Sequence, residues 1–263
     1  RCIFVKIIFS DFDKTLVDRG VDNGKITDFQ LDVLRTIRNN HIDFSIVSGR
    51  CLSFFKEEYP ELMNVVSFFI SSNGSSIYDV SKDSYIYFNF IDSSDLKNVY
   101  ECAKKYNLSL YFNLLDKRFY SEEGSYQYFK FDEMQCEQLV LMGDIENYEI
   151  LIDDIDKIEN LKVSNKGKNP DNGSFFLDIN RKDVSKGKAI SYLYDYLEID
   201  RNDTICFGDS DNDLSMFQVV GKGIAVENAS EKIKENADEI IGTVWEGSVF
   251  KYIDNILKKE NNF

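Results

Sequence analysis

The first third of the chain alternates short apolar runs with an amphipathic stretch. The runs Ile3–Ser10, Phe44–Val47 and Val65–Ser71 are almost continuously apolar, which is typical of strands buried on both faces of a parallel sheet. Between the first two runs, Thr27–Arg38 carries apolar residues at helical spacing, and Thr27 stands where a helix N-cap is expected. Strands and helices in this order predict the beginning of a doubly wound α/β sheet.

A different pattern occupies residues 76–180. It predicts paired strands at 77–80 and 85–90, a helix at 95–106, a hairpin at 110–115 and 118–121, and strands at 148–152, 161–163 and 175–179. The segment is far longer than an ordinary connection of a few residues. We therefore expect an inserted α+β domain over residues 76–180.

The earlier alternation returns after residue 180. Ser185–Leu197 is predicted to be a helix with Ser185 as its N-cap, followed by a strand at Thr204–Phe207. Helices and strands are then expected to alternate at 214–220, 223–226, 230–236, 238–241 and 249–258. The sequence thus predicts a doubly wound, Rossmann-like parallel-sheet core of residues 1–75 and 181–263, interrupted by the inserted domain.

Polar side chains follow four of the predicted strands at the point where each strand ends: Asp11 and Asp13, Ser48, Asn73, and Asp209 with Asp213. Each cluster alone says little, because aspartates at strand ends are often only solvated or cap helices. In an open parallel sheet, however, ligands bind at the carboxyl ends of the strands. We therefore expect these side chains to converge on one edge of the sheet.

Two aspartates separated by one residue suit phosphoryl chemistry. The carboxylate of Asp11 can act as a nucleophile and form an acyl phosphate, while Asp13 can protonate the leaving oxygen and then activate water. With Asp209 and Asp213 they concentrate negative charge, and oxygen ligands of this kind suit Mg²⁺. The sequence therefore predicts a magnesium site among these carboxylates.

Groups that neutralise and hold a phosphate are also present. Lys186, at the start of the helix after the insertion, is placed to neutralise a nucleophile and a phosphate oxygen. Lys188 is its competitor, and either lysine could instead be an exposed helix residue. Ser48 and the amides after it either hold phosphate oxygens or form a plain turn. Asn73 and Gly74 either contact a ligand or form a hairpin turn.

Charge and composition narrow the range of partners. A formal net charge of −15 argues against a nucleic acid or an anionic membrane as partner. The five cysteines are scattered and never form a Cys-x-x-Cys pair, which favours reduced thiols and a cytoplasmic protein. His41 is the only histidine and lies among polar residues, so it is a weak candidate for a general base. No apolar run of about 18 residues predicts a membrane-spanning helix.

The motifs resemble those of a known family. Asp-Phe-Asp-Lys-Thr-Leu at 11–16 resembles the first motif of the haloacid dehalogenase superfamily of phosphatases, and the three others follow in the family's order: Ser48-Gly49-Arg50, Ser185-Lys186-Gly187-Lys188-Ala189, and Gly208-Asp209-Ser210-Asp211-Asn212-Asp213. The long insertion resembles the type-two α+β cap of Cof-like hydrolases, and Ser71-Ser72-Asn73-Gly74 resembles the entry into that cap. The resemblance covers nearly the whole chain.

This resemblance implies a role for each residue. Asp11 would be the nucleophile and Asp13 the general acid and base. Mg²⁺ would be held by Asp11, the backbone carbonyl of Asp13, and Asp209, with Asp213 in support. The phosphoryl group would be positioned by Thr15, Ser48 with Gly49, Lys186 and Asn212, and Asn73 is a further candidate contact.

One position departs from the family pattern. Lys14 stands where these phosphatases usually have glycine. If the position requires a positive φ, a lysine there is costly. If it does not, Lys14 adds a cation near the site.

The expected substrate is a small phosphorylated metabolite, with sugar phosphates favoured. We expect a monomer or small homo-oligomer. Two alternatives stay open: a phosphomutase or phosphotransferase, which passes the phosphoryl group to a sugar hydroxyl, and a non-catalytic phosphate-binding regulatory protein on the same fold.

Overall fold

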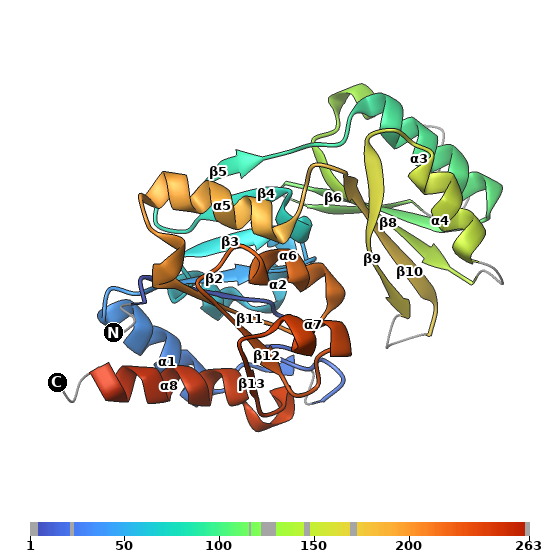
Figure 1. The fold of residues 1–263 in the computed structure, drawn as a ribbon. Helices are drawn as coiled ribbons and strands as arrows, with labels where there is room; N and C mark the ends of the chain where they lie inside the picture. The colour runs from blue at the N-terminus through green and yellow to red at the C-terminus, as the bar shows by residue number, and fades with distance from the viewer. Residues whose placement is uncertain are drawn as a thin grey trace.

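The structure, a computed structural model, describes residues 5–21, 24–115, 117–121, 130–144, 148–168 and 173–260. Cys2 and the first residues of the strand predicted at Ile3–Ser10 lie outside this part of the chain. The described residues form two sheets, one of eight strands and one of five. Figure 1 shows these sheets as two lobes, with both ends of the chain on the lobe of the larger sheet.

The larger sheet has the strand order β13-β12-β11-β1-β2-β3-β4-β5. Its strands are β1 (Ile7–Ser10), β2 (Asp43–Val47), β3 (Phe68–Ser71), β4 (Ser76–Asp79), β5 (Ser84–Phe88), β11 (Thr204–Gly208), β12 (Lys222–Val226) and β13 (Glu239–Ile241). The pairings from β13 through to β3 are parallel, and β4 and β5 pair antiparallel at one edge. The strand order reverses direction at β1 and β11, where an α/β sheet opens a crevice for ligands.

Six helices belong to the lobe of the larger sheet among the described residues: α1 (Asp28–Asn39), α2 (Leu52–Glu58), α5 (Lys186–Leu197), α6 (Leu214–Phe217), α7 (Glu231–Asn236) and α8 (Ser248–Glu260). Figure 1 shows α1 and α8 together on one side of the sheet and α5 on the other. The sheet is therefore covered on both faces, which explains why its parallel strands are apolar along their whole length.

The smaller sheet is antiparallel, with strand order β7-β6-β8-β10-β9. It is built from β6 (Ser109–Leu114), β7 (Arg118–Ser121), β8 (Cys136–Gly143), β9 (Leu161–Lys168) and β10 (Phe175–Arg181), and it carries α3 (Ser93–Lys105) and α4 (Tyr148–Asp156). In Figure 1 both helices lie on the side of this sheet that is turned away from the larger sheet. The opposite face of the smaller sheet is therefore turned toward the lobe of the larger sheet.

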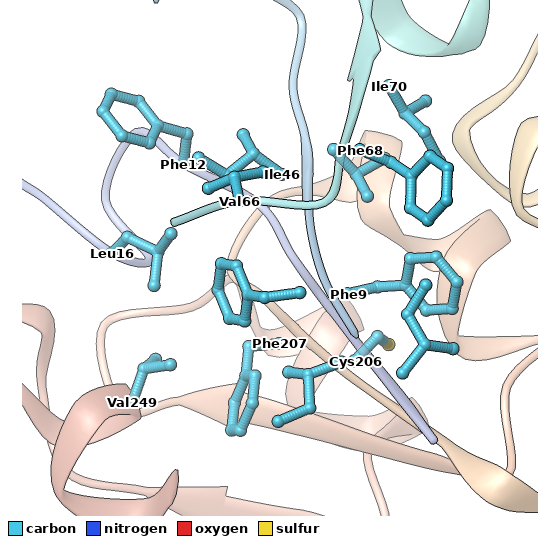
Figure 2. Packing of buried hydrophobic residues seen from close by; sticks show 14 of the residues in the cluster. Phe9, Phe12, Leu16, Ile46, Val66, Phe68, Ile70, Cys206, Phe207 and Val249 are labelled. Carbon is cyan, nitrogen blue, oxygen red and sulfur yellow. The ribbon is translucent and has the colours of Figure 1, made fainter. Parts of the chain in front are cut away.

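Apolar packing holds the end of β1 in place. Figure 2 shows Phe9 and Phe12 among the buried side chains that fill the core with Phe207 and Ile46 of the neighbouring strands. Phe12 is fully buried, and its ring packs edge-on against the ring of Phe55, with 5.0 Å between the ring centres. Burying one such ring contributes about 1.5–3 kcal/mol. The apolar side chain between Asp11 and Asp13 therefore anchors the loop that carries both aspartates.

Most elements of the larger sheet agree with the prediction. The predicted helix at Thr27–Arg38 is α1, and Thr27 caps it through a hydrogen bond from the Gln30 amide. The helix predicted at Ser185–Leu197 is α5, with Ser185 accepting a hydrogen bond from the Lys188 amide. The predicted fold class is confirmed.

Two features of the smaller sheet were not anticipated. The strand predicted at residues 148–152 is wrong, because this segment is part of the helix α4. Leu151 and Ile155, four residues apart, form its buried face, and the apolar run alone did not distinguish this spacing from a strand. The strand β8 was not predicted, since Glu137 and Gln138 interrupt its apolar run, yet both side chains are buried.

The hairpin predicted at 77–80 and 85–90 is present as β4 and β5, but its position differs from the expectation. Both strands extend the larger sheet through the pairing of β4 with β3. We therefore propose that the inserted domain begins after Phe88 rather than at residue 76, and that it ends near Arg181 as predicted.

A left-handed turn joins β3 to β4. Ser72, Asn73 and Gly74 all have positive φ angles, of 50°, 59° and 100°. A side chain on Gly74 would have its first carbon 2.4 Å from the backbone oxygen of Ser185, on the returning chain. Only glycine fits this contact, so the turn after β3 packs directly against the start of α5.

Among the described residues, no helix combines the length and the apolar composition needed to cross a bilayer.

Candidate active site

A buried lysine joins two of the predicted site carboxylates. The Nζ of Lys186 donates hydrogen bonds to Asp11 Oδ1 at 2.5 Å and to Asp213 Oδ1 at 2.6 Å. Its side chain is only 1% exposed. Although burial favours the neutral amine, the two carboxylates raise the pKa of Lys186 above its ordinary value. Lys186 is therefore a cation fixed between the ends of β1 and β11.

The position of this lysine follows from local structure. Ser185 ends the extended segment and caps α5, which makes Lys186 the first residue of the helix. A side chain on Gly187 would place its first carbon 2.1 Å from the backbone oxygen of Ser215. Glycine at this position thus lets α5 approach α6 closely, which brings the start of α5 to the site. Lys188, the competing candidate, is exposed.

The loop after β11 is organised by Asp213. Its Oδ2 accepts hydrogen bonds from the backbone amides of Asp209 and Ser210, both at 3.0 Å. Asp209 in turn accepts hydrogen bonds from Thr15 Oγ1 at 3.0 Å and from Ser210 Oγ at 2.8 Å. With both oxygens occupied, Asp213 supports the loop, whereas Asp209 points its carboxylate toward Thr15 and the loop after β1.

The carboxylates form a site that suits a hard divalent cation. One ligand oxygen from each of Asp11, Asp209 and Asp213 can be chosen so that all three lie within 4.8 Å of one another. Burial raises the pKa of Asp209 to about 6, with Asp213 acting in the same sense. Burial also raises the pKa of Asp11 well above its ordinary value, even though Lys186 acts in the opposite sense. One ammonium does not balance three buried carboxylates, and an all-oxygen donor set fits Mg²⁺.

Asp13 lies near this cluster but its carboxylate is turned to an arginine. Arg50 donates from Nε to Asp13 Oδ2 at 2.8 Å and from Nη2 to Oδ1 at 3.0 Å. This two-point geometry is the strong form of an arginine–carboxylate pair. Phe54 supports it, with the guanidinium carbon 4.8 Å from the centre of its ring. Arg50 belongs to the second motif, but no role was predicted for its side chain.

The structure decides between the two readings of Lys14. Its φ is 64°, so the position does require the left-handed conformation that glycine adopts readily. The Lys14 side chain is exposed, and its carbonyl accepts a hydrogen bond from Asn228 at 2.8 Å. Lysine is therefore tolerated at a backbone cost of about 1–2 kcal/mol.

The remaining predicted residues line the same region. Ser48 is buried, and its hydroxyl accepts a hydrogen bond from the Arg50 amide at 3.1 Å. Asn212 donates to Asn73 Oδ1 at 3.0 Å, which joins the ends of β11 and β3. The buried Oδ1 of Asn212 has no hydrogen-bond partner among the described residues. The expected convergence is thus present, while the role of each residue stays a prediction.

The smaller sheet reaches the site through β9 and β10. Asn73 donates to Ser164 Oγ of β9 at 3.3 Å. Asp178 of β10 accepts a hydrogen bond from Asn165 at 3.3 Å and is 8% exposed. A side chain on Gly49 would place its first carbon 3.6 Å from Asp178 Oδ2. The inserted segment therefore covers the loop of the second motif.

These β10 residues were missed by sequence reasoning, although a signal was present. Leu177 and Ile179 face the apolar core of the inserted segment, so the alternate positions Asp178 and Asn180 must face the opposite side. Both are buried polar residues. Polar residues at alternate positions, directly before the third motif, could have identified the covering wall of the site.

Comparison with known proteins agrees with this geometry. A family model described as haloacid dehalogenase-like hydrolase matches residues 8–253. A 5-amino-6-(5-phospho-D-ribitylamino)uracil phosphatase of Bacillus subtilis is 26% identical, over 95% of this chain and 94% of that protein. A putative phosphatase of Buchnera aphidicola is 28% identical, over 97% of this chain and 99% of its own length.

Solved structures share the fold. A haloacid dehalogenase-like hydrolase from Bacteroides thetaiotaomicron matches with a TM-score of 0.80 and 24% identity, over 96% of this chain and 99% of the other. A sugar phosphatase of haloacid dehalogenase subclass IIB matches with a TM-score of 0.75 and 19% identity, over 95% of this chain and 98% of the other. The family predicted from the four motifs is confirmed. The chain belongs to the haloacid dehalogenase-like hydrolases, as an enzyme of the phosphatase type.

Proposed function

We propose that this chain is a magnesium-dependent phosphatase that hydrolyses small phosphomonoesters, sugar phosphates above all, through an aspartyl-phosphate on Asp11. The observation that carries the proposal is the contact of Lys186 Nζ with Asp11 Oδ1, at 2.5 Å, beside the carboxylates of Asp209 and Asp213. A nucleophilic carboxylate must stay ionised while it approaches a phosphate, and fixed positive charge makes this possible.

Each further residue has a part in this proposal. Asp13 would donate a proton to the leaving oxygen and afterwards accept one from water. Its carboxylate is paired with Arg50, so it must exchange this partner for the substrate. Thr15, Ser48, the amide of Gly49 and Lys186 would hold the phosphoryl oxygens, and Asn73 and Asn212 would order the loops around them. Asp11, the Asp13 carbonyl and Asp209 would hold Mg²⁺, with Asp213 in support.

A bound magnesium ion would supply charge neutralisation and polarise the phosphoryl group. The proposal also includes a cytoplasmic location. It is supported by Cys51, Cys102, Cys136 and Cys206, which are free in the described part of the chain. A monomer or small homo-oligomer remains our expectation.

The test is a screen of phosphorylated metabolites for Mg²⁺-dependent release of inorganic phosphate, followed by Asp11→Asn. We expect this variant to lose about 10³-fold or more in kcat/KM, because nucleophiles act as part of a unit. Asp211→Asn, in the same loop as Asp209 but with a side chain 60% exposed, is the matched control. Full activity of Asp11→Asn would exclude the proposed nucleophile.

The screen also separates the alternatives. Transfer of the phosphoryl group to an added sugar in place of phosphate release would favour a phosphotransferase or phosphomutase. Absence of turnover with every ester, together with binding of inorganic phosphate, would favour a phosphate-binding regulatory protein.

A further inference from the structure

One carboxylate near the site belongs to none of the four motifs. Asp178 lies on β10, on the face opposite to Leu177 and Ile179. It is 8% exposed, and its Oδ2 lies so near Gly49, between the proposed phosphate-binding Ser48 and Arg50, that a side-chain carbon added to this glycine would be 3.6 Å away. A buried charge on the inner face of a covering sheet requires an explanation, because burying it costs free energy.

The surroundings of Asp178 are polar, and most of them are neutral. Its partners include the amides of Asn165 and Asn73 and the more distant charges of Arg50 and Arg118. Ser164 lies beside it on β9 and is hydrogen-bonded to Asn73. The wall that closes over the second motif therefore offers hydroxyl and amide groups and one carboxylate acceptor.

Both guanidiniums near Asp178 are already engaged. Arg50 holds Asp13 through two hydrogen bonds and also interacts with Asp178. Arg118 interacts with Asp178 and lies over the ring of Tyr111, at 4.6 Å from its centre. A negatively charged group on a substrate would have to compete with Asp13 or Asp178 for either arginine.

We propose that Asp178 selects the leaving group of the substrate: it accepts hydrogen bonds from hydroxyl or amino groups and rejects leaving groups that carry a second anion. This inference rests on the proposed phosphatase function and narrows its substrates to esters of neutral or cationic polyols. Like charges brought together at a buried interface discriminate strongly between partners.

The competing explanation is that Asp178 only braces the β9–β10 hairpin through Asn165. The two explanations differ in one measurable quantity. A brace affects all substrates by the same factor, whereas a selecting carboxylate changes the ratio of kcat/KM between a neutral and an anionic substrate.

The experiment compares glycerol 1-phosphate with 3-phosphoglycerate. These esters share a three-carbon skeleton, and a carboxylate replaces one hydroxymethyl group in the second. The assays run at pH 8 with Mg²⁺, above the value of about 6 to which burial raises the pKa of Asp178, so that this carboxylate is ionised. We expect the unmodified protein to prefer glycerol 1-phosphate by about tenfold or more.

Asp178→Asn keeps the shape of the side chain and removes the charge. We expect the preference for the neutral ester to fall by about tenfold, because the repulsion disappears and the anion no longer competes with Asp178 for the nearby arginines. Asp153→Asn removes one exposed charge from α4, away from the site, and should leave the preference unchanged. If Asp178→Asn does not fold, Asp178→Ser provides the same comparison.

The outcomes are distinct. No advantage for the neutral ester in the unmodified protein, or an unchanged ratio in a folded Asp178 variant, would overturn this inference while the phosphatase proposal stands. If the unmodified protein turns over no phosphoester at all, the phosphatase proposal, on which this inference rests, would instead be overturned.

Discussion

The two sides of the site are built differently. On the side of the larger sheet, Lys186, Asp11 and Asp213 form a buried cluster of opposite charges that is anchored by strand ends and a helix start. On the side of the smaller sheet, Ser164 and Asn165 present neutral groups beside the carboxylate of Asp178. Under the proposed function, the strong, fixed charge would serve the reaction, whereas the weaker polar contacts would serve selection of the substrate.

The largest effect is expected from Lys186→Met, which removes the cation of the charged side. Asp11 and Asp213 then remain buried without their partner, and breaking a buried pair in this way costs about 3–5 kcal/mol of unfolding free energy. Burial already raises the pKa of Asp11 in the folded state, and loss of Lys186 removes the group that acts in the opposite sense. The remaining stability is therefore highest below about pH 4 and falls as the pH rises through the folded-state values.

Urea unfolding in EDTA at pH 5 and pH 8 measures this effect, with a larger loss expected at pH 8. Lys188→Met is the matched control, because the same substitution two residues later affects an exposed lysine. Equal losses in the two variants would show that Lys186 is not the charge that holds the site together.

A smaller effect is expected from Asn180→Ala, at the junction of the two sides. Asn180 is fully buried, and its Nδ2 donates to Ser72 O at 2.9 Å, to Ser75 Oγ at 3.0 Å and to Glu137 O at 3.2 Å. Leaving such acceptors unsatisfied costs about 1–3 kcal/mol. Thermal and urea unfolding measure the loss.

Asn165→Ala serves as the comparison for this variant, since Asn165 is only half-buried and bonds Asp178 at 3.3 Å. An equally large loss in Asn165→Ala would place the stabilising contacts at the rim of the interface instead of at the junction.

The smallest effect is expected from Lys14→Gly, in the loop of the first motif. Glycine relieves the positive φ of 64° but adds freedom to the unfolded chain, so we expect a net gain of at most about 1 kcal/mol. Lys25→Gly, at an exposed loop position without positive φ, should instead lose about 0.4–1 kcal/mol. A loss in both variants, measured by urea unfolding, would contradict the strain assigned to Lys14.

The same contrast explains what could be predicted from the sequence. The charged side could be predicted because the parallel strands are apolar throughout and end in polar residues. Asp11, Ser48 and Asp209 could therefore be assigned to one edge of the larger sheet. The smaller sheet was harder, because its strands mix buried polar and apolar residues. Glu137 and Gln138 concealed β8, and Leu151 with Ile155 formed a helix where a strand was expected.

Side-chain partners across the two lobes were not predictable at all. The approach of Asp178 to the loop of Gly49 depends on how the inserted segment sits on the larger sheet. The pairing of Arg50 with Asp13, between two loops of the larger sheet itself, was not predicted either. No local pattern encodes this arrangement. Only the alternation of apolar and polar residues along β10 indicated a polar face, and it did not indicate which part of the larger lobe that face contacts.

The contact of Gly74 with the Ser185 carbonyl has a mechanical consequence. The Gly74 turn and the start of α5 both belong to the lobe of the larger sheet, because β4 and β5 follow the turn in that sheet before the chain crosses to the smaller one. The contact therefore ties together the two residues beside it, Asn73 and Lys186, within one lobe. Any displacement of the inserted segment would have to occur beyond this contact, and it would leave the hydrogen bond from Lys186 to Asp11 in place.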